Sequence, residues 1–199
     1  MADNLARENA KESATEEATP PRLRRFIEGL DRVLEQGAGE PYIVGEGAAL
    51  LRELVAHDDW LPEPVAQPDP QYYRQYLLYR DPQARFSVVS FVWGPGQSTP
   101  IHDHTVWGLI GLLRGAEISQ DFERAADGAL VKVGAPLRLE TGDVTAVSPA
   151  LGDIHQVFNA YTDRISIGIH VYGADIGAVD RSVFTVDGAV KPFRSGYAN

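Results

Sequence analysis

From Gln71 onward the chain consists of short β-forming runs separated by turn residues, and this pattern limits the fold more than any other feature. Gly, Pro and Asp residues break this region into short runs, and such frequent turn signals are typical of short strands. The pairs Asp127-Gly128 and Asp187-Gly188 read as hairpin turns. So many short strands favour a β-sandwich or barrel. The predicted strands are Tyr73–Arg80, Arg85–Trp93, Val106–Leu113, Ala116–Glu123, Val131–Leu139, Val144–Val147, His155–Asn159, Ile165–Tyr172, Val183–Val186 and Val190–Phe193.

The residues before this region predict two helices that pack outside the barrel. The first opens at Pro20-Pro21 and ends at Gly37, and its apolar residues follow the helical period. The second is expected from about Glu46 to His57. Residues 1–19 are polar and poor in large apolar side chains, which predicts a disordered arm. We therefore expect a single domain over residues 20–199, with helices at about 20–60 and the barrel at about 71–199.

Three histidines stand out within the β-rich region. His102 and His104 lie two residues apart in the stretch GQSTPIHDHTVWGLIGLLRG (96–115), which reads as a β-strand. Residues at i and i+2 of a strand share a face, with Cα atoms about 6.6 Å apart, so both imidazoles could reach one metal ion. Such a pair is a weak signal without a third ligand. His155 is the candidate for that ligand, in the second stretch GDVTAVSPALGDIHQVFN (142–159).

The order of glycine, proline and histidine in these two stretches resembles the paired motifs of the cupin superfamily. This resemblance implies a mainly β cupin double-stranded β-helix (jelly-roll) barrel, with His102, His104 and His155 around one metal ion. Gly108 stands where many cupins carry a glutamate ligand. The implied centre therefore has three histidines and no carboxylate.

Three neutral imidazoles would leave a divalent ion with its full positive charge and, in octahedral geometry, about three open positions. Such a centre favours an anionic substrate that binds the metal directly. A thiolate is the natural soft candidate, because coordination deprotonates a thiol. Oxygen could take a remaining position, which would hold both reactants together.

Further motifs resemble the cysteine dioxygenase family of thiol dioxygenases. They are IHDHT followed by an apolar run ending in LLRG, FVWGPGQ (91–97) and IHVYGADIG (169–177). The resemblance implies Fe(II) as cofactor and addition of both atoms of O2 to the sulfur of a small thiol, giving a sulfinate. It implies that Tyr172 points its hydroxyl at the substrate and the oxygen, with His170 behind it.

Two positions depart from this family. Many members carry, at the position of Gly108, a cysteine that is cross-linked to the tyrosine, and this chain has no cysteine. Some members carry a serine two residues before the histidine, which completes a Ser-His-Tyr relay. Here that position is Gly168, so the outer member of the relay is missing, and water could replace it.

The resemblance also suggests how the substrate is chosen. Mammalian cysteine dioxygenases place an arginine at the position that Gln75 occupies here, whereas glutamine resembles the bacterial branch that prefers 3-mercaptopropionate. In that branch a second arginine, nine residues after the tyrosine, pairs with the substrate carboxylate, and Arg181 has this spacing. A guanidinium group suits a carboxylate, and Gln75 could add one neutral hydrogen bond. Arg74 is the competing anchor if the register is shifted by one residue.

Three other interpretations stay open at this point. The first keeps the reaction and makes cysteine the substrate. The second is a cupin that only binds a metal or a small ligand. The third is a zinc centre that polarises water for hydrolysis, because three histidines and an open position also suit zinc.

Composition narrows the possible partners and compartments. The formal net charge is −10 and there is no basic stretch, which argues against nucleic acid or an anionic membrane as partner. The absence of cysteine excludes disulfides and thiolate zinc sites. No apolar run approaches the length of a membrane span, and the first residues lack the apolar core of a secretion signal. We expect a cytoplasmic protein, monomeric or a small homo-oligomer, that binds a small thiol and O2.

Overall fold

The computed structural model describes residues 19–199, and the arm expected at residues 1–19 lies, apart from Thr19, outside the described residues. Two helices precede eleven strands in this part of the chain. None of its helices is both long and apolar enough to cross a bilayer. The elements are α2 (Pro21–Glu35), α3 (Glu40–Val55), the short 3-10 helix η1 (Glu63–Val65), β1 (Arg74–Arg80), β2 (Ser87–Trp93), β3 (Ile101–His102), β4 (Gly108–Arg114), β5 (Ala116–Arg124), β6 (Leu130–Glu140), β7 (Val144–Val147), β8 (His155–Asn159), β9 (Ser166–Tyr172), β10 (Arg181–Phe184) and β11 (Val190–Phe193).

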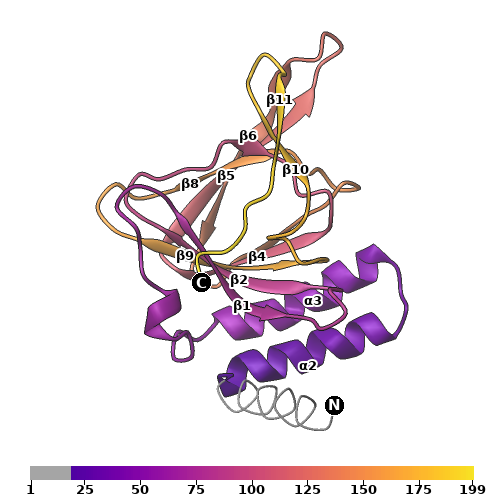
Figure 1. The fold of residues 1–199 in the computed structure, drawn as a ribbon, viewed down its shortest axis with the longest axis vertical. Coiled ribbons are helices and arrows are strands. Elements are labelled where there is room, and N and C mark those ends of the chain that lie inside the picture. Colours follow the sequence, from indigo (N-terminus) through magenta and orange to yellow (C-terminus); the bar gives the residue numbers. More distant parts are fainter. Residues whose placement is uncertain (1–18) are drawn as a thin grey trace, which may run out of the picture.

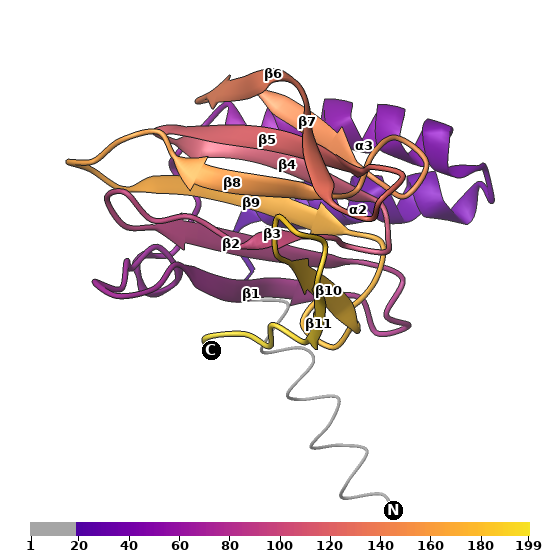
Figure 2. The ribbon, with the colours of Figure 1, turned by 90° about the horizontal axis from the view of Figure 1, so that it is seen from above.

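The strands form two antiparallel sheets that face each other (Figure 1). One sheet has the order β1-β2-β9-β4-β7 and the other the order β11-β10-β3-β8-β5-β6. Strands far apart in the sequence are therefore neighbours in space, as the wrapping of a jelly roll requires. The expected mainly β double-stranded β-helix with external helices is confirmed. Seen from above, both helices lie to one side of the barrel (Figure 2).

The helices cover the outer face of the five-stranded sheet. Leu30 of α2 and Leu51 of α3 are fully buried against outward-facing residues of β2, β4 and β9. Because α2 and α3 cover one face and the barrel interior covers the other, every residue of β2 and β9 is buried. These two central strands are consequently the most rigid support that the fold offers to a site on their inner face.

The inner faces of the sheets carry a different set of side chains. Val89, Phe91 and Trp93 alternate with the outward-facing residues of β2 and pack with Tyr172 of β9 inside the barrel. Residues that lie opposite each other in a ladder share a face. Since Phe91 lies opposite Gly168 and Val89 opposite His170, Gly168 and His170 also point into the barrel.

Two elements differ from the sequence-based prediction. Helix α3 begins at Glu40, six residues earlier than expected, because Gly45 and Gly47 obscured the helical pattern. Gly47 allows α3 to pack closely against β4, because a Cβ atom at this position would lie 2.8 Å from Leu109 Cδ1 of β4. The expected strand through His102 and His104 is also wrong, because β3 ends at His102.

The packing of α3 against β4 predicts the effect of one substitution. Leu51→Ala should lower the free energy of unfolding by about 2–5 kcal/mol, because the removed side chain is fully buried and leaves a cavity. Urea denaturation followed by circular dichroism measures this change. Leu137→Ala is the control, because Leu137 is 47% exposed and its truncation should change stability by less than about 0.5 kcal/mol. Equal losses in both variants would contradict this account of the core.

Candidate metal centre

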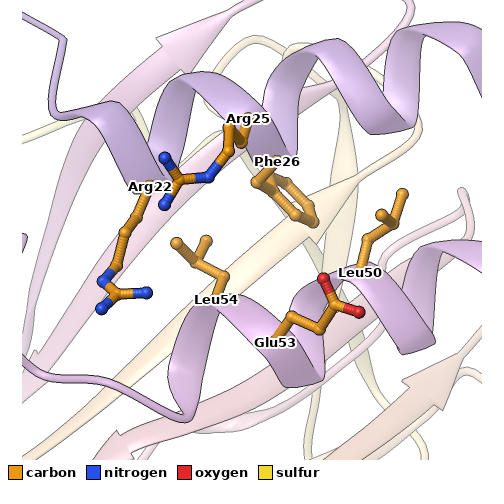
Figure 3. A pocket seen from close by; sticks show the side chains of 6 residues that line it. All are labelled: Arg22, Arg25, Phe26, Leu50, Glu53 and Leu54. Carbon is orange, nitrogen blue, oxygen red and sulfur yellow. The ribbon is translucent and has the colours of Figure 1, made fainter.

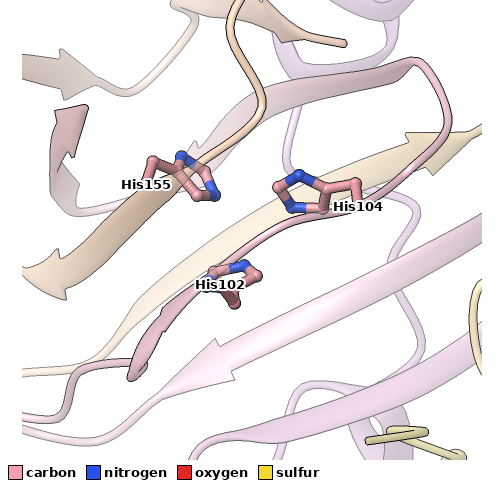
Figure 4. A group of neighbouring side chains, drawn as sticks. All are labelled: His102, His104 and His155. Atoms are coloured by element: carbon pink, nitrogen blue, oxygen red, sulfur yellow. The ribbon is translucent and has the colours of Figure 1, made fainter. Parts of the chain in front are cut away.

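His102, His104 and His155 meet inside the barrel, and their rings face one another (Figure 4). The centroids of the three rings lie 4.9, 4.8 and 4.9 Å apart, so they form a nearly equilateral triangle. One ring nitrogen from each residue lies within 4.8 Å of the others. All three residues are buried. This cluster could hold one metal ion.

Each ring has a hydrogen-bond partner at Nδ1. The His102 ring pairs with the carbonyl oxygen of Pro100 at 3.0 Å, and the His155 ring pairs with Ser119 Oγ at 3.0 Å. The His104 ring pairs with Asp153 Oδ1 at 2.9 Å. With Nδ1 used in this way, Nε2 of each ring is the nitrogen left for a metal ion. Such outer partners fix the orientation of a ligand ring and increase its basicity.

Burial keeps the three rings in the form that binds metals. Desolvation lowers the pKa of His102 to about 4, and it lowers the pKa of His104 and His155 well below the ordinary value. Neutral imidazole is a metal ligand, whereas imidazolium is not. At neutral pH the cluster therefore offers three lone pairs without first losing protons. Three neutral nitrogens fit either Fe(II) or Zn(II).

His102 and His104 are close together although they do not lie on one strand, contrary to the sequence-based prediction. His102 lies opposite His155 in the pairing of β3 with β8, which places two of the rings side by side. His104 lies beyond β3, just before Thr105, whose φ of 62° turns the chain. The Asp153 carboxylate accepts hydrogen bonds from the backbone N–H groups of His104 and Thr105 at 3.1 and 2.8 Å. Asp153 therefore fixes both the backbone position and the ring orientation of His104.

Tyr172 adjoins this cluster, and His170 lies next to Tyr172. The Tyr172 ring stacks against His104, with centroids 5.4 Å apart. Its hydroxyl forms a hydrogen bond of 2.9 Å with His170 Nδ1. Burial raises the pKa of Tyr172 above its ordinary value, so the phenol holds its proton. A Cβ atom on Gly108 would lie 2.9 Å from the Tyr172 ring, so a glutamate ligand at this position would displace the tyrosine.

Arg181 is a buried cation on the same side of the barrel. It is only 4% exposed, and its charge lowers the pKa of both His102 and His104. Its Nη2 donates a hydrogen bond to Ser195 Oγ at 2.7 Å, and its guanidinium group lies over the Phe193 ring. Its Nε has no hydrogen-bond partner, and no carboxylate of residues 19–199 forms an ion pair with it. The neighbouring Asp180 pairs with Arg194 instead.

Gln75 and Arg74 point to opposite sides of β1. Gln75 lies opposite the inward-facing Phe91, and its Oε1 is buried without a hydrogen-bond partner. Arg74 is exposed and forms an ion pair with Asp69. Of the two arginines that the sequence offered as anchors, only Arg181 lies inside the barrel.

Sequence reasoning missed three side chains that support this region. Asp153 precedes His155 by two residues, so an acidic residue beside a predicted ligand was the available signal. Ser119 and Glu117 lie on β5, a strand that the sequence predicted without indicating which of its faces points inward. They face the barrel interior, and only the pairing of β5 with β8 reveals this.

A surface hollow between α2 and α3 is separate from this centre (Figure 3). It is lined by Arg22, Arg25, Phe26, Leu50, Glu53 and Leu54. The five-stranded sheet lies between this hollow and the histidine cluster. The hollow therefore takes no part in the chemistry of the barrel.

The similarity of this chain to proteins of known structure is weak. No family model matches the chain. Its structural neighbours include an uncharacterized protein with a double-stranded β-helix domain from Klebsiella pneumoniae (16% identity, TM-score 0.48, 64% of this chain and 93% of that one). A cupin superfamily protein from Desulfitobacterium hafniense is also similar (15% identity, TM-score 0.44, 60% of this chain and 94% of that one). A third neighbour is a Cupin 2 conserved barrel domain protein from Salinispora arenicola (24% identity, TM-score 0.41, 60% of this chain and 89% of that one). At these TM-scores the fold assignment depends on the chain's own strand order.

We expect Asp153→Asn to weaken metal binding by about 10–100-fold, because it removes the charged partner that orients His104. Anaerobic titration of the chelator-treated protein with Fe(II) or Co(II) measures the dissociation constant. Asp163→Asn is the matched control, because Asp163 is exposed and pairs only with Arg164. An unchanged constant in Asp153→Asn would show that the hydrogen bond does not support the ligand.

The neutral histidines also predict how the stability of the chelator-treated protein depends on pH. The unfolded chain takes up protons near pH 6.5, whereas the folded His102 does so only near pH 4. The free energy of unfolding should therefore fall as the pH drops from about 6.5 toward 4, by up to about 1.4 kcal/mol per pH unit for each such histidine. Urea denaturation at several pH values measures how steeply the free energy of unfolding depends on pH. His102→Gln should make this dependence less steep by the contribution of one histidine. An identical slope in the variant would contradict the assignment.

Proposed function

We propose that this protein is a non-haem Fe(II) thiol dioxygenase that adds both atoms of O2 to the sulfur of a small thiol carboxylate and releases a sulfinate. We propose 3-mercaptopropionate as the favoured substrate. In this proposal His102, His104 and His155 are the metal ligands, Tyr172 and His170 serve catalysis, and Arg181 and Gln75 bind the substrate.

The observation that carries this proposal is the unpaired Arg181 guanidinium beside an all-histidine cluster. A buried charge without an ion-pair partner costs several kcal/mol, and this cost is offset when an anion binds. A thiol carboxylate can satisfy both parts of the site at once, because its sulfur suits a metal and its carboxylate suits the guanidinium. The buried, unpartnered Gln75 Oε1 adds a neutral polar contact inside the barrel.

Ferrous iron, when bound, would supply open positions for a thiolate sulfur and for O2, and the sulfur itself would supply the electrons that reduce O2. The chain's own residues hold and orient the reactants. Arg181 binds the carboxylate and thereby fixes the direction of the substrate chain. Tyr172, held in place by its contact with His104 and its hydrogen bond to His170, presents a hydroxyl at the edge of the cluster. The apolar wall of Val89, Phe91 and Trp93 limits water in the interior.

The test is oxygen consumption by protein loaded with Fe(II) under anaerobic conditions, with sulfinate measured as the product. We expect turnover of 3-mercaptopropionate, slower turnover of cysteine and little turnover of cysteamine, which lacks a carboxylate. Arg181→Met should raise KM for 3-mercaptopropionate by about 100-fold, as expected for loss of a buried charged partner. It should leave the low activity on cysteamine unchanged, because no carboxylate is involved.

Arg74→Met is the matched control, because Arg74 is an exposed arginine that already pairs with Asp69. A loss of activity in Arg74→Met but not in Arg181→Met would reject Arg181 as the anchor. Preferred turnover of cysteine would favour the cysteine dioxygenase alternative. No oxygen consumption with any thiol would reject the dioxygenase and favour a metal-binding cupin, and zinc in protein purified without added metal would favour hydrolytic chemistry.

A further inference from the structure

Behind Tyr172 and His170, several polar atoms are buried without hydrogen-bond partners among the described residues. Both carboxyl oxygens of Glu117, the Nε2 atom of His170 and the indole N–H of Trp93 belong to this group. Glu117 is 1% exposed and projects from β5 across the barrel toward β9. Buried polar groups are nearly always paired in folded proteins, so this cluster calls for a functional explanation.

Gly168 creates the space that these atoms share. A Cβ atom at this position would lie 2.8 Å from His170 Nε2 and 3.0 Å from Glu117 Oε1. The two atoms are therefore at most about 6 Å apart, a separation that one bridging water molecule spans. Any larger residue at position 168 would come between them. The absence of a side chain at Gly168 thus leaves the Glu117 carboxyl facing the back of the His170 ring.

We propose that Glu117, His170 and Tyr172 form a proton relay, in which Glu117 is the outer member and sets the ring tautomer of His170. The inference extends the proposed function, because Tyr172 is the group that faces the metal centre. Its geometric basis is the 2.9 Å hydrogen bond between His170 Nδ1 and the Tyr172 hydroxyl on one side of the ring, and the shared space over Gly168 on the other. Phe91 stacks on the His170 ring at 4.1 Å and holds it in this plane.

The relay has two states that differ by one proton on Glu117. When Glu117 is ionised, it accepts a hydrogen bond from His170 Nε2–H, directly or through water, and Nδ1 accepts a hydrogen bond from the Tyr172 hydroxyl, which keeps its proton. When Glu117 is protonated, it donates to Nε2, the ring proton moves to Nδ1, and Nδ1–H donates to the Tyr172 oxygen. In this second state the hydroxyl hydrogen of Tyr172 is free to point at a substrate. His170 stays neutral in both states.

The side chains around Glu117 and His170 determine the pH at which the relay changes from one state to the other. Burial raises the pKa of Glu117 to about 8, partly offset by the nearby Trp93 indole, which forms no hydrogen bond of normal geometry with it. Burial also lowers the pKa of His170 to about 3, so the ring takes up no second proton. The titratable groups that face Glu117 are His170 and Tyr172 of β9. Its strand partners are neutral, namely Leu139 of β6 and Asn159 of β8.

The decisive measurement is the tautomer of His170 by ¹⁵N nuclear magnetic resonance of the full chain loaded with diamagnetic zinc, between pH 6 and 9.5. We expect the wild-type nitrogen shifts to exchange between the two tautomers with a midpoint near pH 8. Glu117→Gln should remove this midpoint, because the amide does not titrate. Glu123→Gln, at an exposed position of the same strand, should leave it unchanged.

Gly168→Ala provides a second variant, because its methyl group would separate the two atoms and should shift or abolish the midpoint. A wild-type protein without a tautomer change near pH 8, or a midpoint that persists in Glu117→Gln, overturns the relay even if another variant fails to fold. These measurements use no thiol, so failure of the relay is distinguishable from failure of the dioxygenase proposal. If the Fe(II) protein is active, kcat should fall above about pH 8 in wild type and lose this dependence in Glu117→Gln, with KM unchanged.

Discussion

The hydrogen bonds at Nδ1 of the three clustered histidines are the interactions on which the centre depends. Without them each imidazole could rotate or exchange its tautomer, and the three Nε2 atoms would not converge. Their partners come from separate parts of the chain, namely a backbone carbonyl, a carboxylate on the turn before β8 and a hydroxyl on β5. The centre is therefore a product of barrel closure, and any change that opens the barrel also loosens the ligands.

The same closure explains why polar chemistry is possible inside an apolar scaffold. Helices α2 and α3 cover the outer face of the five-stranded sheet, so β2 and β9 are held from both sides. A strand supported in this way positions side chains to within a fraction of an ångström, which is the precision that a catalytic group needs. His170 and Tyr172 lie on β9 and share this support, and Phe91 on the adjacent β2 stacks on the His170 ring.

The barrel interior contains two buried ionisable groups that the described part of the chain leaves without an ion-pair partner. Arg181 has no carboxylate partner among the described residues, and Glu117 is buried without hydrogen bonds. Each of these two groups is costly to bury in its charged form. Proteins keep such groups where binding or proton transfer requires them. The unpaired arginine supports an anionic substrate, and the unpaired glutamate supports a relay that ends at Tyr172.

The sequence by itself determined most of the secondary structure, the barrel class and the histidines that meet. The β-forming runs and the turn residues between them place most strands within one or two residues, and β7, β8 and β11 at their observed bounds. The spacing of the histidine motifs indicated the right cluster, although the strand argument for His104 was wrong. Only the tertiary structure showed that Asp153 holds this residue, that Arg181 is buried and unpaired, and that Glu117 faces His170 over Gly168. These contacts join residues that are far apart in the chain. A pattern within a short stretch of sequence does not indicate which strands become neighbours when the barrel closes. Barrel closure decides those contacts, since it sets what each inward-facing side chain meets.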